Sequence, residues 1–374
     1  MQQVLFIAGT RPEVIKMAPV VKAAYRRLNT VFMLTGQHRQ MARQVLAAFE
    51  LEPDIDLDIM VPGAGLAQLS SRLMTRFDAY LADNRPEMVV VQGDTSSAAL
   101  IGLVAFYRQI PVAHVEAGLR SFDNYSPFPE EVNRKIISTY AALNFPPTPL
   151  AKTNLLQEHV PAHSMVVTGN TVVDALDMLK TRLPRPHGDG KRHILVTTHR
   201  RESWSHEIRN ICLALLKIAE KNEDVQITLP VHKNPIVADQ VHSILDEQPR
   251  IRLTEPLDYL TLQQTLAKSY LVLTDSGGIQ EEAPSHGVPV LVLRKVTERP
   301  EAVAAGMARV VGTDTDAIVS CCQEFLDNQE LYHKASKGKN PFGDGLASRR
   351  IVGAIMRYLK GRGELIGKYG EFGG

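Results

Sequence analysis

Cysteine is scarce in this chain of 374 residues, which contains only Cys212, Cys321 and Cys322. Two of the three are adjacent, which disfavours an ordinary disulfide between them, and no CxxC spacing typical of metal ligands occurs. The composition therefore predicts a protein of a reducing compartment, with neither a disulfide framework nor a structural zinc site.

Long apolar runs and an excess of one charge are also missing. No run approaches the roughly 18 residues that a membrane span needs, and the N-terminal MQQ lacks the basic stretch of a signal peptide. With 42 basic and 41 acidic residues, the net charge of +1 gives no bulk preference for nucleic acid or anionic lipid. We expect a cytoplasmic protein with no nucleic-acid and no membrane partner.

What the chain does contain is an alternation of short apolar runs with helical patterns. Its length suggests two domains, and its hydrophobic content of 44% is ordinary for a globular protein. Because the apolar runs are continuous, they predict parallel strands buried on both faces, in doubly wound α/β domains. The predicted strands cover residues 4–8, 31–35, 88–92, 111–115, 141–145 and 165–168, and then 193–198, 225–230, 251–254, 270–275, 289–293 and 309–312.

A segment rich in proline, glycine and charge, PRPHGDGKR, has the composition of a linker. We predict an N-terminal Rossmann-like domain over residues 1–172 and a C-terminal Rossmann-like domain over 173–348. A last helical pattern begins near residue 349, and the segment 349–374 is expected to pack back on the first domain. The final GKYGEFGG is expected to fray.

Ligands of open parallel sheets bind outside the carboxyl ends of the strands, so the polar residues that follow the apolar runs are informative. The first such stretch, GTRPEVIKMAP, follows residues 4–8. Gly9 permits a tight turn, and Arg11 and Lys16 together with backbone N–H groups would form a phosphate cradle. The alternative is a helix start with a solvated arginine.

Three carboxylates follow in the first domain. Asp94 comes after the strand 88–92, where it either caps a helix or acts as an acid or base. Glu116 ends the run 111–115, and a buried glutamate is rare unless it is paired or functional. Glu130, in SPFPEEVNR, either starts a helix or joins the other two. Clustered carboxylates push their pKa values apart, so that one serves as base while another serves as acid.

The second domain offers complementary groups at its predicted strand ends. In DSGGIQEEAPS, backbone N–H groups at Ser276, Gly277 and Gly278 could bind phosphate, and Glu282 could accept hydrogen bonds from a ribose diol. Arg299, in TERPEA, adds a cation. The alternative is a capped helix with an acidic surface patch.

Two further motifs, THRRES and PVHKNP, place His199, Arg200 and His232 at strand ends. His199 is either a core histidine or part of an anion site. Taken together, the motifs predict a negatively charged, sugar-like ligand in a cleft between the two domains.

These motifs together resemble the non-hydrolysing UDP-N-acetylglucosamine 2-epimerases. The matching stretches, in the family's order, are GTRPEVIKMAP, TGQHRQM, GDT, HVEAGLRS, SPFPEEVNR, THRRES, PVHKNP, DSGGIQEEAPS, TERPEA and VGTD. The resemblance implies a GT-B-type fold, a homodimer, and interconversion of UDP-GlcNAc and UDP-ManNAc without a metal or a nicotinamide cofactor. It implies removal of the C2 proton, loss of UDP from C1 to give 2-acetamidoglucal, and re-addition of UDP.

The resemblance also assigns roles to residues. Asp94, Glu116 and Glu130 match the family's acid/base carboxylates, although which of them is the base is left open, and His199 matches its catalytic or UDP-stabilising histidine. The positions that match the UDP-binding residues are Arg11, Lys16, Ser276, Gly277, Gly278, Glu282 and Arg299.

Some bacterial members bind a second UDP-GlcNAc as an activator. The positions that match this allosteric site are Gln37, Gln40, Glu130, Arg200 and His232. Gly63 stands where the regulated members carry an arginine, so we expect activation to be weak or absent. Three rival functions remain: a hydrolysing 2-epimerase that releases ManNAc and UDP, a GT-B glycosyltransferase, and a non-enzymatic sugar-nucleotide sensor.

Overall fold

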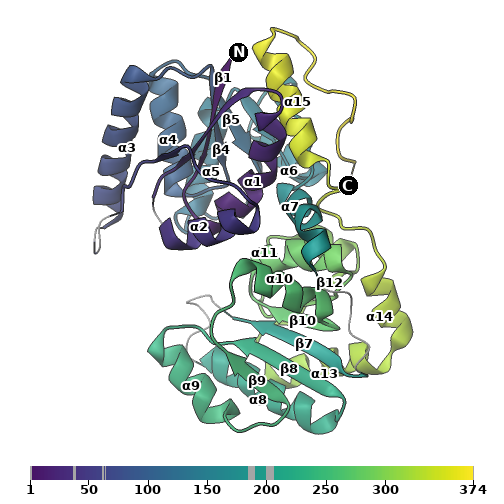
Figure 1. The fold of residues 1–374 in the computed structure, drawn as a ribbon. Coiled ribbons are helices and arrows are strands. Elements are labelled where there is room, and N and C mark those ends of the chain that lie inside the picture. Colours follow the sequence, from purple (N-terminus) through teal and green to yellow (C-terminus); the bar gives the residue numbers. More distant parts are fainter. Residues whose placement is uncertain are drawn as a thin grey trace. The chain divides into compact units, whose positions relative to one another are not determined.

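The computed structural model describes residues 2–36, 39–60, 63, 65–183, 190–198 and 206–373, with the backbone alone at 39–41. The chain forms two compact units (Figure 1). Unit 1 comprises Met1–Leu179 and Phe342–Gly374, and unit 2 comprises Lys180–Pro341. The predicted boundary after residue 172 falls inside the helix Thr171–Leu179, which belongs to unit 1.

Unit 1 is built on a parallel sheet. Its strands are β1 (Gln3–Ala8), β2 (Asn29–Leu34), β3 (Ile55–Asp56), β4 (Met88–Gln92), β5 (Val112–Val115) and β6 (Leu143–Phe145). Its helices are α1 (Arg11–Tyr25), α2 (Arg39–Ala48), α3 (Leu66–Asp83), α4 (Ser96–Tyr107), α5 (Glu130–Tyr140), α6 (Pro149–Gln157), α7 (Thr171–Leu179) and α15 (Ala347–Leu359). The strand order is β3-β2-β1-β4-β5-β6.

The apolar runs of unit 1 are strands because both faces of the sheet are covered. All five residues of β4, MVVVQ, are buried. The core on one side joins Val89 and Val91 of β4 to Leu73 and Phe77 of α3 and to residues of α4 and α5. Helix α1 packs against α2, α7 and α15. Helix α15, coloured yellow in Figure 1, therefore belongs to unit 1 although it comes from the end of the chain.

Unit 2 repeats the same plan. Its strands are β7 (Arg192–Thr197), β8 (Val225–Pro230), β9 (Ile251–Thr254), β10 (Leu271–Thr274), β11 (Val290–Val292) and β12 (Ala308–Val310). Its helices are α8 (His206–Lys221), α9 (Pro235–Leu245), α10 (Tyr259–Lys268), α11 (Gly277–Glu282), α12 (Pro300–Ala304), α13 (Thr315–Asp327) and α14 (Gln329–Ser336). The strand order is β12-β11-β10-β7-β8-β9.

Both units thus have the Rossmann strand order, read from opposite edges of the sheet. In this order the connections diverge between the first and fourth strands, and ligands bind outside the carboxyl ends there. The relevant pairs are β1 with β4 in unit 1 and β7 with β10 in unit 2. The prediction of two doubly wound parallel-sheet domains is confirmed.

Two strand predictions need correction. Strand β3, Ile55–Asp56, was not predicted, because two residues are too few to give an apolar run. Residues 165–168, predicted as a strand, form only one isolated bridge, between Met165 and Asn144. Val166 N–H donates to Asn144 O, but the next backbone amide, that of Val167, donates to the Glu371 side chain, so the segment is shared with the C-terminal segment.

The prediction of a frayed tail is wrong for the described residues. Phe372 is buried, and its N–H donates to Val167 O at 2.9 Å. Glu371 accepts from Val167 N–H at 2.9 Å and pairs with Lys152 at 3.1 Å. One apolar anchor and one charged anchor hold the segment, although its glycine-rich composition is typical of a flexible end.

Candidate active site

The start of α1 is held by its own glutamate. Glu13 is buried, and its Oε2 accepts hydrogen bonds from the backbone N–H groups of Gly9 at 2.8 Å and Thr10 at 2.6 Å. Its Oε1 accepts from the Thr95 hydroxyl at 2.6 Å, and Thr95 caps α4. Glu13 therefore ties together the turns after β1 and before α4. Its carboxylate also occupies two amides that the phosphate-cradle interpretation needs.

Glu116 stands directly after β5, where three polar side chains meet its carboxylate. Lys16 of α1 and Gln92, the last residue of β4, each donate to one of its oxygens, and Asn170 Nδ2 donates to Oε1 at 3.2 Å. The side chains of Lys16 and Glu116 are only 10% and 8% exposed. Glu116 has a φ of 66°, an uncommon value for a residue with a side chain, and such backbone strain is often found at functional sites.

Asp94 is held from α5. Arg134 Nε donates to Asp94 Oδ2 at 2.9 Å, and Arg134 Nη1 donates to Glu131 Oε2 at 3.0 Å. Glu131 is fully buried and also accepts from the backbone N–H groups of Ser121 and Phe122. The Asp94 side chain remains 28% exposed. Arg134 and Glu131 thus fix the carboxylate that faces outward.

The turn between β4 and α4 brings Asp94 near Glu116. A Cβ placed on Gly93 would lie 3.9 Å from Glu116 Oε2. His114, fully buried on β5, donates from Nε2 to Gly93 O at 2.7 Å. Burial lowers the pKa of His114 to about 4, so the ring is neutral at pH 7 and holds this turn as a hydrogen-bond donor.

Two other predicted residues of unit 1, Glu130 and Arg11, begin helices that follow strands of this sheet. Glu130 is the first residue of α5, beside Glu131, and is half-buried. Arg11 is the first residue of α1 and is half-exposed. Within the described residues, the Arg11 guanidinium has no hydrogen bond or ion pair. Since Glu13 already compensates the helix start, Arg11 remains available to an external anion.

In unit 2 the carboxyl ends of β7 and β10 meet through two threonines. The hydroxyls of Thr197 and Thr274 lie 2.6 Å apart, and Thr274 Oγ1 accepts from Ser276 N–H at 2.9 Å. Ser276 caps α11 through a long bond of 3.5 Å from Ile279 N–H. Gly277 and Gly278 follow, both half-exposed. The turn is therefore held through Thr274, and Gly277 and Gly278 themselves add no side chain to its surface.

Two pairs of residues support this turn. Arg299 Nε donates to Glu281 Oε1 at 2.5 Å, and a Cβ on Gly277 would lie 3.5 Å from Arg299 Nη2. Glu282 Oε2 accepts from Gln263 Nε2 at 2.6 Å, and Gln263 Oε1 in turn lies 2.9 Å from His286 Nε2. Burial lowers the pKa of His286 to about 4.

The structure describes the remaining predicted residues only in part. His199, Arg200 and Gln37 lie outside the described residues, and only the backbone of Gln40 is described, in α2. His232 follows β8, and its Nδ1 accepts from Asn234 N–H at 3.0 Å. Gly63 lies in a turn with a φ of 75°.

A family model described as UDP-N-acetylglucosamine 2-epimerase matches residues 22–356. The chain belongs to this family. The epimerase of Salmonella typhimurium is 45% identical over 95% of this chain and 99% of its own length. That of Bacillus subtilis is 45% identical over 95% of both chains.

Solved structures give the same result for this epimerase. A Staphylococcus aureus protein in complex with UDP is 44% identical, with a TM-score of 0.90 over 100% of both chains. The Neisseria meningitidis UDP-GlcNAc 2-epimerase bound to UDP-GlcNAc is 41% identical, with a TM-score of 0.90 over 95% of this chain and 100% of that one. A glycosyltransferase of kitacinnamycin, 9% identical with a TM-score of 0.63, shares the fold alone. The predicted family and the GT-B-type fold class are confirmed.

Several supporting residues of the epimerase were not predicted. The supporting residues without a predicted role are Glu13, Gln92, His114, Glu131 and Arg134. All of them lie within or beside the motifs named in the sequence analysis. Among the described residues, no group of three or more His, Cys, Asp and Glu side chains could hold a metal ion. In that same part of the chain, no helix combines the length and apolar character of a membrane span.

Proposed function

We propose that the protein interconverts UDP-GlcNAc and UDP-ManNAc without releasing free sugar. The observation that carries this proposal is the carboxylate of Glu116, which Lys16, Gln92 and Asn170 hold at the carboxyl end of β5. The C2 proton of the sugar is weakly acidic, so its removal needs a base whose position is fixed. Asp94, in the turn between β4 and α4, is held by Arg134.

The reaction balances without a cofactor. A base takes the proton from C2, the electrons of that bond form a C1–C2 double bond, and the bond from C1 to the diphosphate oxygen breaks. The products are 2-acetamidoglucal and UDP. The reverse reaction, with the proton delivered to the other face of C2, completes the inversion. Two faces require at least two proton-transfer groups, and Asp94, Glu116 and Glu130 are our candidates, with His199 assisting.

We assign UDP binding to the turn of Ser276, Gly277 and Gly278 in unit 2. The small side chains leave the backbone accessible to a phosphate, and Arg299 lies against Gly277. The ribose hydroxyls would donate to Glu282, which Gln263 orients. Arg11 and Lys16 of unit 1 would assist, because fixed cations stabilise the charge that develops on the leaving diphosphate. The S. aureus relative solved with UDP supports a UDP site in this family.

Proton NMR of UDP-GlcNAc incubated with the protein in D2O tests the proposal. UDP-ManNAc carrying deuterium at C2 is the expected product. Free ManNAc plus UDP as main products would instead assign the protein to the hydrolysing class. Unchanged substrate without exchange, at protein concentrations that bind UDP, would favour a glycosyltransferase or a sensor.

Regulation by a second UDP-GlcNAc is a separate proposal. The residues that match the activator site are Gln37, Gln40, Glu130, Arg200 and His232, but Gly63 replaces the arginine of the regulated members. Its φ of 75° is a conformation that suits glycine and not arginine. We therefore expect hyperbolic kinetics with UDP-GlcNAc as sole ligand, and a sigmoidal curve would contradict this. A homodimer and a cytoplasmic location stay predictions. Measuring the molecular mass in solution tests the homodimer.

A further inference from the structure

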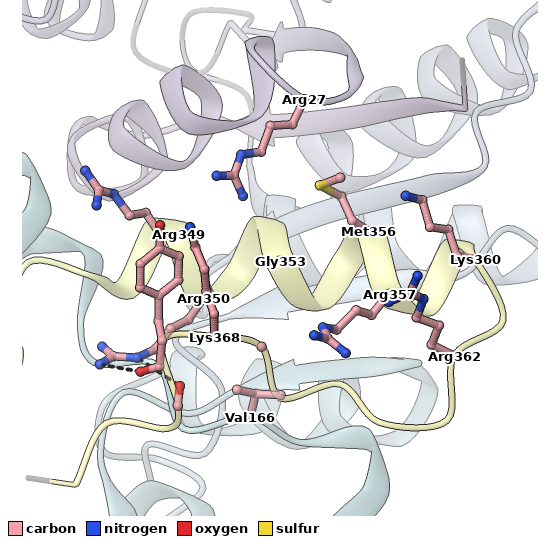
Figure 2. Close-up of a pocket in the computed structure, with 13 residues that line it drawn as sticks. Arg27, Val166, Arg349, Arg350, Gly353, Met356, Arg357, Lys360, Arg362 and Lys368 are labelled. Carbon is pink, nitrogen blue, oxygen red and sulfur yellow. Dashed lines mark hydrogen bonds between the residues drawn. The ribbon is translucent and has the colours of Figure 1, made fainter.

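A cavity of about 260 Å³ lies in unit 1. It is bounded by the end of α1, by α15 and by the C-terminal segment that follows α15 (Figure 2). None of the predicted active-site residues lines it. Its walls carry six basic side chains that are exposed or half-exposed, namely Arg27, Arg349, Arg357, Lys360, Arg362 and Lys368.

Among the described residues these six cations have no carboxylate partner, and two of them, Arg349 and Lys368, lie over the ring of Tyr369. No carboxylate is among the lining residues, and within the described part of the chain none of the six makes an ion pair. The chain as a whole has a net charge of only +1, so the positive charge is concentrated here. Like charges gathered in a hollow repel one another and raise the local concentration of anions.

A seventh basic residue of the wall, Arg350, has a different role. Its side chain is only 4% exposed and pairs with Asp344 through bonds of 2.6 and 2.7 Å. It also donates to Thr168 O and Gly370 O. Arg350 therefore fastens the C-terminal segment beside α15, so that the segment forms a fixed wall of the cavity.

A glycine provides a second, independent observation. Gly353 lies in the middle of α15 and lines the cavity, and no atom lies within 4 Å of the place where its Cβ would be. A glycine inside a helix lowers helix stability relative to alanine, so its use usually has a packing or functional reason. In Figure 2 the guanidinium of Arg27 extends from the end of α1 toward this helix, and Arg349 and Arg357 lie toward its two ends. Any side chain at 353 would occupy the space between them.

We propose that this cavity binds a small ligand that carries several phosphate groups. Four of the six cations are arginines, whose planar guanidinium groups bind phosphate through two parallel hydrogen bonds. The basic groups surround a concave space, which suits a small polyanion better than the flat surface of an anionic membrane. This site is additional to the proposed UDP site in unit 2.

Inorganic tripolyphosphate is a suitable probe, with titration calorimetry as the measurement. The protein is first saturated with UDP, so that the proposed nucleotide site does not take up the probe. We expect saturable binding of one tripolyphosphate per chain. The double variant Arg349→Gln/Arg357→Gln should bind about tenfold more weakly or worse, since each charged hydrogen bond contributes substantially. Arg252→Gln, an exposed arginine of β9, is the matched control and should bind as the wild type does.

Gly353→Glu tests the cavity without removing a cation. We expect it to abolish tripolyphosphate binding and to raise the melting temperature, because the carboxylate occupies the cavity and compensates the cations. Gly353→Gln separates this effect from helix propensity, and it should raise the melting temperature less. Epimerisation measured by NMR should be unchanged in all these variants, which shows that they are folded.

Three results would overturn the proposal. The first is no saturable binding of tripolyphosphate by the wild type. The second is unchanged affinity in both the double variant and Gly353→Glu. The third is sedimentation of the wild type with phosphatidylglycerol vesicles, lost in the double variant, without any binding of tripolyphosphate, which would assign the basic residues to a membrane surface.

Discussion

Units 1 and 2 share one strand order but use the carboxyl ends of their strands differently. In unit 1 the backbone N–H groups before α1, the helix that follows β1, are satisfied internally, because the Glu13 carboxylate accepts hydrogen bonds from Gly9 and Thr10. In unit 2 the turn after β10, the strand that corresponds to β4, is held by Thr274 Oγ1 and by a long bond from Ile279 N–H to Ser276 Oγ, and two glycines follow. One fold thus provides a fixed set of carboxylates in one copy and, in the other, a turn with two glycines to which we assign UDP.

The difference teaches that topology locates a site but does not define its chemistry. In unit 1 the side chains at the strand ends pair with each other, as Lys16 does with Glu116 and Arg134 with Asp94. Such pairing fixes in position the carboxylates that we propose as proton-transfer groups. In unit 2 the supporting residues lie beneath the turn and leave its surface to a ligand. We therefore expect substitutions in unit 1 to affect turnover and those in unit 2 to affect nucleotide affinity.

The largest expected effect is that of Glu116→Gln. Loss of a positioned acid or base typically costs about 10²- to 10⁴-fold in rate, so turnover in the NMR assay should fall by that amount. The affinity for UDP, measured by calorimetry, should change less than about threefold, a difference of about 0.65 kcal/mol. Glu87→Gln, an exposed glutamate before β4, is the matched control. Equal losses of turnover and of UDP affinity would end the proposed division between the units.

Arg134→Met should produce the largest loss of stability in unit 1. It removes the cation that pairs with the fully buried Glu131 and with Asp94. Breaking a buried ion pair by removing one partner costs about 3 kcal/mol or more, which denaturant unfolding would detect. Arg108→Met breaks an exposed pair with Asp78 and should leave the unfolding midpoint nearly unchanged. A similar small effect for Arg134→Met would mean that Glu131 is satisfied by its two backbone amides alone.

Gly278→Val should weaken UDP binding with little effect on folding. A Cβ at this position meets only Ser276 Oγ, at 3.8 Å, so the fold accommodates it. A branched side chain would nevertheless cover the backbone to which we assign the diphosphate. We expect the dissociation constant to rise about tenfold or more, equivalent to about 1.4 kcal/mol, with an intermediate effect for Gly278→Ala. Gly65→Val, at an open position of unit 1, should not change it. Unchanged affinity in Gly278→Val would relocate the UDP site.

The sequence predicted well what depends on apolar runs and on residue order. All six strands of unit 2 overlap the predicted ranges, because each contains several apolar residues. The two-residue β3 and the bridge at Met165 were not predictable in this way, since neighbouring segments and not local composition decide their pairing. The tail was predicted wrongly because the burial of Phe372 depends on contacts with residues distant in sequence.

Site residues show the same division. Glu116 was predictable from its place after an apolar run, and Asp94 from its place after β4. The partners of these carboxylates were harder to find, because Lys16, Gln92 and Asn170 come from three separate parts of the chain. Arg134 was within a quoted motif, yet only the fold shows that it joins Asp94 to Glu131. Sequence order identifies reactive groups, whereas tertiary packing identifies what positions them.

A last prediction concerns one histidine in each unit, the buried His114 and the half-buried His286. Burial lowers the pKa of both to about 4, below the ordinary value of 6.5. The unfolded chain therefore binds protons that the folded chain excludes, so the stability is fully present above pH 6.5 and is lost as the pH falls toward 4. For each histidine, the free energy of unfolding falls by up to about 1.4 kcal/mol per pH unit over that range. Unfolding at pH 7 and pH 5 should show a smaller acid loss in His114→Gln and in His286→Gln than in the wild type. If only one variant reduced the acid loss, the unit that carries that histidine would be the one that acid unfolds first.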